Sequence, residues 1–122
     1  MTKEQAIQDF WSSFGLPAYD SQTVPQSAVM PYITYDVYTS KFEDVVTLTA
    51  SLWYYSTSWK AISEKASEIA RYIGTGFQIK KVDGGYVWIT QGAPFAQRMS
   101  DPADGMIRRI YLITQAEFLT AY

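Results

Sequence analysis

Neither histidine nor cysteine occurs among the 122 residues of this chain, and charged residues make up only 18% of it. Histidine and cysteine are the side chains that most readily titrate, attack a substrate or bind soft metals near neutral pH, so their absence excludes Ser-His and Cys-His catalysis. It also excludes disulfide bonds, which agrees with a cytoplasmic origin. Soluble domains carry about 25% charged residues, and this low value indicates that a partner covers part of the surface.

Long apolar runs and basic clusters are also missing. No stretch approaches the roughly 20 apolar residues of a membrane span, and the first ten residues, MTKEQAIQDF, lack an apolar core of signal-peptide length. The net charge is −2, and basic residues adjoin only in the pairs Lys80-Lys81 and Arg108-Arg109. Such pairs are too small for a nucleic-acid-binding surface. We therefore expect no membrane partner and no sequence-specific nucleic-acid partner.

Aromatic residues are abundant instead, with four tryptophans, ten tyrosines and six phenylalanines. Tyrosine and tryptophan bury a large apolar area and keep a polar tip, which is why they are enriched at protein interfaces. The composition therefore favours a protein that packs against other proteins over an enzyme.

The remaining polar residues show no catalytic or metal-binding pattern. The acidic residues fall on expected helix faces and loops, without the spacing that would indicate a paired-carboxylate site. Asp101, Asp104 and Gly105 lack the alternating oxygen donors and terminal glutamate of a calcium-binding loop. We expect no enzymatic activity, no cofactor and no metal.

Hydrophobic periodicity predicts a single α+β domain over residues 1–122. A capping box at Thr2 and Gln5 begins a short helix that Gly15 ends, and residues 16–29 form a loop. A second helix is expected over 59–73, with strands over 30–40, 45–55, 77–82, 86–90 and 106–118. The order is α-β-β-α-β-β-β, a mainly antiparallel sheet of four or five strands with the helices packed on one face.

The expected core consists of the apolar residues that share the inward positions of these elements. They are Phe10, Phe14, Ile33, Leu48, Leu52, Ile62, Ile69, Ile73, Ile110 and Leu112.

Two features of the sequence suggest a partner interface. Trp53 and Tyr55 fall on the polar face of the strand 45–55, where either helix packing or another subunit must cover them. The second feature is the expected loop 91–104, bracketed by Gly92 and Gly105. Loops of this length are commonly functional or disordered.

The loop mixes apolar and charged side chains, namely Phe95, Arg98, Met99, Asp101 and Asp104. Two interpretations stand side by side. It is a mobile contact arm, or it is a local structure in which Arg98, Arg108 and Arg109 form ion pairs with the two aspartates. The candidate interface residues are Trp53, Tyr55, Phe95, Arg98, Met99, Asp101, Asp104 and Arg108.

Several stretches of the chain together resemble a known family. They are Phe14-Gly15-Leu16-Pro17, Pro31-Tyr32-Ile33-Thr34-Tyr35, LTASLWYYSTSW leading into AISEKASEIARYI, the Asp83-Gly84-Gly85 turn, and GAPFAQRMSDPADGMIRRIYL. In this succession, over essentially the whole chain, the sequence resembles the small tail terminator and tail completion (head–tail joining) proteins of long-tailed bacteriophages.

The resemblance implies a subunit that assembles with copies of itself into a ring, usually hexameric, on the end of the tail tube. Its partners would be the tail tube protein and the head connector protein. It would reside in the virion, at the tail or head–tail junction, after assembly in the bacterial cytoplasm from a phage or prophage gene. A ring that DNA traverses benefits from a lumen that does not bind phosphate, which agrees with the mildly acidic composition.

Two other functions remain open at this point. One is another head–tail connector component that docks on the capsid side. The other is a small ligand-binding α+β module, which a closed apolar cavity ringed by Trp53, Trp59 and Trp88 would favour.

Overall fold

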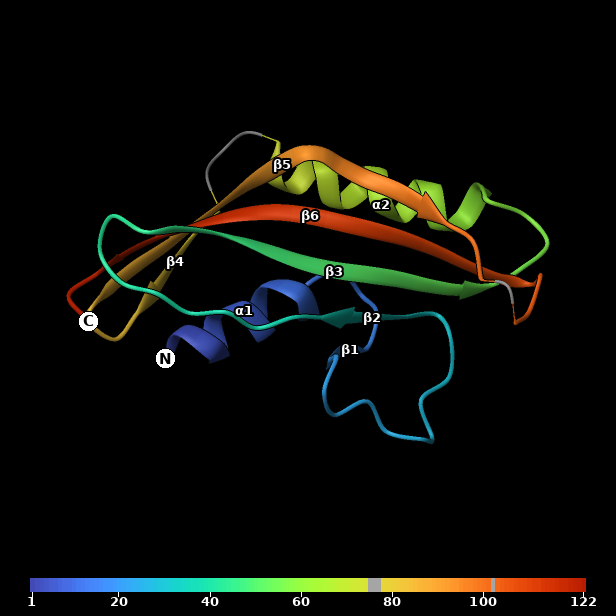
Figure 1. Ribbon diagram of the computed structural model, residues 1–122, viewed down its shortest axis with the longest axis horizontal. Coiled ribbons are helices and arrows are strands. Elements are labelled where there is room, and N and C mark those ends of the chain that lie inside the picture. Colours follow the sequence, from blue (N-terminus) through green and yellow to red (C-terminus); the bar gives the residue numbers. More distant parts are fainter. Residues whose placement is uncertain (75–77, 102) are drawn as a thin grey trace.

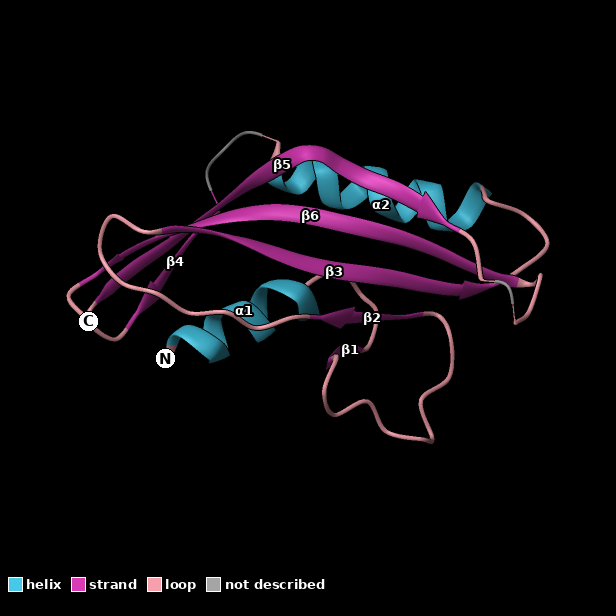
Figure 2. Cartoon of the chain, in the orientation of Figure 1, coloured by secondary structure: helices cyan, strands magenta, loops and turns pink. Residues whose placement is uncertain are grey.

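In the part of the chain that the structure describes, two helices, each followed by three strands, form an α+β fold with a curled, mostly antiparallel sheet (Figure 1). The computed structural model describes residues 1–74, 78–101 and 103–122. The helices are α1 (Lys3–Ser12) and α2 (Lys60–Ile73). The strands are β1 (Ala18–Asp20), β2 (Tyr32–Tyr35), β3 (Val45–Tyr55), β4 (Gln78–Val82), β5 (Gly85–Met99) and β6 (Ile107–Thr120). The three long strands β3, β6 and β5 are central neighbours in the sheet order β1-β2-β3-β6-β5-β4 (Figure 2).

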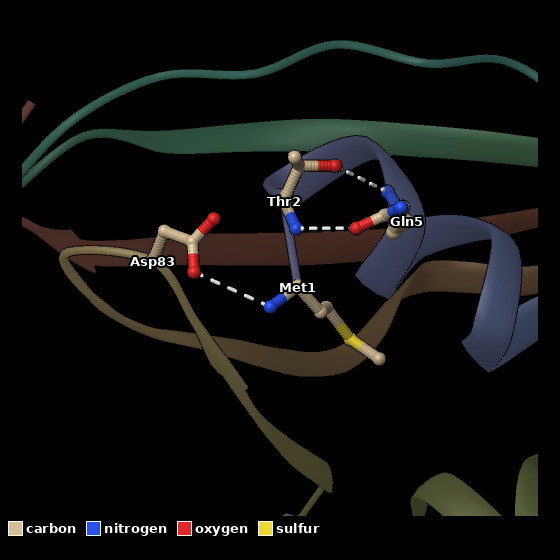
Figure 3. A network of polar contacts seen from close by, with 4 residues as sticks. All are labelled: Met1, Thr2, Gln5 and Asp83. Carbon is tan, nitrogen blue, oxygen red and sulfur yellow. Dashed lines mark hydrogen bonds and ion pairs between the residues drawn. The ribbon is translucent and has the colours of Figure 1, made fainter.

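The start of α1 follows the capping box expected from the sequence. Thr2 Oγ1 accepts a hydrogen bond from the Gln5 amide at 3.1 Å, and the Thr2 amide donates to Gln5 Oε1 at 2.8 Å (Figure 3). The terminal amine of Met1 forms an ion pair with Asp83 at 3.3 Å. These contacts satisfy amide groups that a helix start leaves unpaired, and they join it to the β4–β5 turn.

One face of the sheet is apolar, and both helices pack on it. Side chains alternate along a strand, so Leu52 of β3 and its partner Ile110 of β6 share this inner face. Both are buried and belong to the same hydrophobic cluster as Ile62 and Ile69 of α2 and the α1 side chains. In Figure 1, α2 lies behind β5.

The segment that follows α1 also contacts α2. The rings of Phe14 and Tyr72 meet edge to face with centroids 5.2 Å apart, and Lys65 Nζ of α2 donates to the Phe14 carbonyl oxygen at 2.9 Å. The whole predicted core is buried, including Phe10, Ile33 and Leu112, which have no exposed surface. The prediction of an α+β fold with one core is therefore confirmed.

The expected element order lacked one strand. β1 has only three residues, lies in the predicted loop 16–29 and pairs in parallel with β2. A strand this short shows no periodicity of its own, and it forms because the Ile33 amide donates to the Pro17 carbonyl at 2.8 Å. The observed order is α-β-β-β-α-β-β-β, and the sheet has six strands instead of four or five.

The strand predicted over 30–40 is shorter than expected and covers only Tyr32–Tyr35. It is antiparallel to β3, and the connection between the two strands spans residues 36–44. The Phe42 amide in this connection donates to the Thr120 carbonyl at 2.9 Å, so the segment crosses to the end of β6 instead of turning back tightly.

The loop predicted over 91–104 is wrong for its first nine residues, because β5 continues to Met99. Beyond Gln91 the strand pairs again with β6, from Ala96 opposite Leu112 to Met99 opposite Arg109. Gly92 and Pro94 are residue types that predict a loop, yet they belong to an irregular bulge inside a strand.

Gly92 is required in this bulge by its surroundings. A Cβ atom here would lie 2.6 Å from Ile113 Cγ2 and 2.8 Å from the Ile113 carbonyl oxygen. Only a residue without a side chain lets β5 approach β6 this closely and resume pairing after the bulge.

Candidate interaction surfaces

The side of the sheet opposite the helices carries partly exposed aromatic and aliphatic side chains. We call this surface the outer face; it comprises alternate residues of the three central strands. They are Val45, Thr47, Thr49, Ser51, Trp53 and Tyr55 of β3, Ile107, Arg109, Tyr111, Ile113, Gln115, Glu117 and Leu119 of β6, and Tyr86, Trp88, Thr90, Gln97 and Met99 of β5. Both described helices pack on the inner face, so neither covers it. The outer face is therefore a surface that no described helix covers, and several of its aromatic and aliphatic side chains are partly exposed.

Trp53 lies in a polar and cationic setting at one end of the outer face. Its indole Nε1 donates to Thr34 Oγ1 at 2.9 Å, and the Arg109 guanidinium lies 4.7 Å from its ring centroid. Arg109 also approaches the Tyr111 ring at 5.8 Å, and its Nε donates to Ser51 Oγ at 3.1 Å. These contacts hold the guanidinium flat against the sheet, with a cation–π interaction of about 0.5–1 kcal/mol at an exposed site.

A second cluster lies at the same end of the molecule, but its strand residues occupy positions that alternate with those of the outer face. Here the Trp59 ring is approached by two guanidinium groups, that of Arg98 at 4.8 Å and that of Arg108 at 5.2 Å. We call these three residues the arginine pole. Arg108 is further fixed by bonds from Nη1 to the Gly105 carbonyl at 2.7 Å and from Nη2 to the Thr57 carbonyl at 3.0 Å. Arg98 remains exposed, so the pole offers a positive group to a partner.

Tyr55 ends β3 close to both clusters and is 58% exposed. The negative charge of Asp104 raises the pKa of Tyr55 above its ordinary value, with smaller contributions from burial and from its hydrogen bond to Asp104. Burial first, and then the charge of Glu68, raises the pKa of Tyr54 on the other side of the strand.

The predicted interface residues separate into groups in the structure. Trp53 and Met99 lie on the outer face, both directly beside Arg109 in the sheet. Arg98 and Arg108 meet at Trp59, and Asp104 meets Tyr55. Phe95 is different, because it packs against the hydrophobic core.

The alternative interpretation of the loop, an ion-pair cluster between the arginines and the two aspartates, is not found within the described residues. Each aspartate instead accepts a hydrogen bond from its own turn. Asp101 Oδ1 binds the Ala103 amide at 2.8 Å, and Asp104 Oδ1 binds the Met106 amide at 2.8 Å. Such short local bonds stabilise a turn without needing an arginine.

The candidate site residues chosen from the sequence omitted most of the outer face. Tyr111, Ile113 and Glu117 of β6 all lie on it, and so does Trp88 of β5. The strand predicted over 106–118 could have identified them. Ile110 and Leu112 were assigned to the core, and because side chains alternate along a strand, their neighbours must face outward.

The tryptophans do not surround one cavity. Trp53 and Trp88 lie opposite Arg109 and Glu117 of β6, eight residues apart, a separation of about 27 Å along the strand. Trp59 lies at the arginine pole. A hollow of about 410 Å³ lies elsewhere, between the start of α1 and β1, and it is open and mostly polar. This arrangement offers no support for a ligand-binding module built on the three tryptophans.

In residues 1–74, 78–101 and 103–122, no helix is long and apolar enough to cross a membrane. The same residues contain no group of three or more acidic side chains placed to bind a metal ion. No protein-family model matches the sequence, and no curated protein or solved structure matches it either.

Proposed function

We propose that this protein is a structural subunit of a long-tailed bacteriophage, a tail terminator or tail completion (head–tail joining) protein. It caps the tail tube as a homo-oligomeric ring, hexameric in the assembly, and contacts the tail tube protein and the head connector protein. Its place is the virion, at the tail or head–tail junction.

The outer face is the observation that carries this proposal. A sheet that is covered by helices on one side and exposes Trp53, Tyr111 and Ile113 on the other offers an aromatic surface for a partner protein. Its central position on the long strands also makes it rigid, as an assembly interface requires.

The arginine pole supports the ring specifically. A closed ring uses two different patches on every protomer, one meeting the other on the next copy. The strand residues of the arginine pole alternate with those of the outer face, so the two surfaces lie on different sides of the sheet. They are two such patches. Arg98 gives the second patch an exposed positive charge. Arg109 lies beside Trp53 on the outer face, and neither arginine forms an ion pair with a carboxylate in the described residues.

The test combines the purified protein with polymerising tail tube protein and measures particle shape and tube length by negative-stain microscopy. We expect rings, and tubes that stop growing when the protein is present. The double variant Trp53→Ala with Arg98→Ala should lose capping, whereas Arg71→Ala on the exposed side of α2 should retain it. Tubes that grow to the same length with and without the wild-type protein would contradict the proposal.

A further inference from the structure

We propose that the outer face binds a second copy of this chain in a two-fold dimer. The two sheets face each other with their β6 strands antiparallel, and Ile113 lies on the symmetry axis. This inference stands independently of the proposed phage function, because it depends only on the order of side chains along three strands.

The outward side chains of β6 form a self-complementary series. In order they are Arg109, Tyr111, Ile113, Gln115 and Glu117. When the strand of the second copy runs the opposite way about Ile113, each Arg109 meets the Glu117 of its partner copy. Tyr111 meets Gln115, and the two Ile113 side chains meet each other.

The neighbouring strands complete the match. Trp53 lies beside Arg109 and Val45 beside Glu117, both on β3. The same operation places Trp53 of one copy against Val45 of the other.

On β5 it places Met99 against Trp88, which lie beside Arg109 and Glu117 respectively. All four side chains are at least partly exposed in the protomer, and Val45 is 56% exposed. Apolar groups therefore meet apolar groups at each corner of the contact.

The alternative two-fold arrangement with parallel β6 strands is unfavourable. It would place Arg109 opposite Arg109 and Glu117 opposite Glu117, and like charges across an interface are repulsive. The charge order along β6 thus selects the antiparallel dimer.

Both charges are available for an intermolecular pair. Within residues 1–74, 78–101 and 103–122, neither Arg109 nor Glu117 has an ion-pair partner. Arg109 is held in place by Ser51 and by the Trp53 ring. Ordering it on binding therefore costs little additional side-chain entropy.

The dimer is expected to be weak. From Arg109 to Glu117 the face measures about 27 Å, and three strands span about 14 Å, so each copy offers at most roughly 400 Å² of sheet. Stable complexes bury about 1,200–2,000 Å² in total, and smaller contacts belong to transient pairs. A twist of about 30° between the sheets displaces the ends of the facing strands by about 7 Å, which is a further reason to expect weak binding.

The dimer and a bound assembly partner would compete for the same surface. Self-association in solution would shield Trp53 and Ile113 until a higher-affinity partner displaces the second copy.

A charge-swap experiment tests the dimer by sedimentation velocity over a wide concentration range. Arg109→Glu and Glu117→Arg should each raise the dimer dissociation constant at least about tenfold, since each places two pairs of like charges in contact. The double variant restores both pairs and should return to within about threefold of the wild type. Arg71→Glu and Glu64→Arg, the same changes on the exposed side of α2, should have no effect.

Ile113→Glu provides a second test if a swap variant fails to fold. It places two carboxylates on the axis of the dimer and should leave a folded monomer by circular dichroism. The proposal is overturned if the wild type is monomeric throughout, if self-association survives the single reversals, or if folded Ile113→Glu still dimerises. Self-association that the folded double variant does not regain would also overturn it.

Discussion

Phe95 and Arg98 lie three residues apart on β5 but have different surroundings. Phe95 packs against the hydrophobic core, whereas Arg98 is exposed and lies over the Trp59 ring. Phe95→Ala should lower the free energy of unfolding by about 1–3 kcal/mol, less than for a fully buried phenylalanine. Arg98→Ala should lower it by less than about 1 kcal/mol, as expected for an exposed cation–π contact. Urea unfolding of both variants measures this, and equal losses would contradict the placement of Phe95.

Tyr55 provides a test of the contact with Asp104. Its pKa is raised in the folded protein, so its neutral form is favoured. This contribution to stability is present below about pH 10, the unfolded value, and is lost as the pH rises through the folded pKa. Asp104→Asn removes the charge and should lower the pKa of Tyr55 toward its ordinary value.

The titration is followed by the ring-carbon NMR signals of the tyrosines, with Tyr55→Phe for assignment. Tyr35 and Tyr54 serve as internal controls, because burial is the main cause that raises their pKa values. A Tyr55 titration that does not change in Asp104→Asn would show that the two side chains do not interact.

At the scale of elements, the bulge in β5 decides where the strand resumes pairing. Gly92→Ala would push a methyl group against the Ile113 backbone and should destabilise the protein by about 1–3 kcal/mol. Gly105→Ala is the matched control, because a Cβ atom there meets nothing within 4 Å. It should be neutral or stabilise by up to about 1 kcal/mol. Thermal unfolding compares the two, and an unaffected Gly92→Ala would mean that the strands are not this close.

At the scale of the whole molecule, one hydrophobic cluster joins both helices to five of the six strands. Phe10 of α1, Ile69 of α2 and Phe118 of β6 all belong to it and are fully buried. We therefore expect a single cooperative unfolding transition, with the same midpoint by far-ultraviolet and near-ultraviolet circular dichroism. Separate midpoints would show that the protein does not unfold in a single cooperative transition.

The molecule also has two distinct ends. Both termini lie toward one end, and the end of β5 and the start of β6 lie at the other (Figure 1). Arg98 and Arg108 of the arginine pole belong to these two strand ends. This polarity suits a subunit that must present different surfaces to different neighbours, as the proposed ring does.

Local patterns in the sequence were enough to determine several elements of this protein. The capping box at Thr2 and Gln5, the limits of β3 and the buried side of α2 all depend on residues close together in the chain. Their periods of about 3.6 and 2 residues also identify the inward side chains, so all ten predicted core residues are buried.

Only the tertiary structure decided the candidate site. Trp53 and Arg109 are brought together by pairing between strands far apart in sequence, and no local pattern specifies that register. Phe95 packs inward because β5 resumes pairing after the bulge, although its glycine and proline neighbours suggest a loop. β1 exists because β2 offers it an edge. The outer face follows from the same cause, since strand order and helix placement determine which side of the sheet is left uncovered.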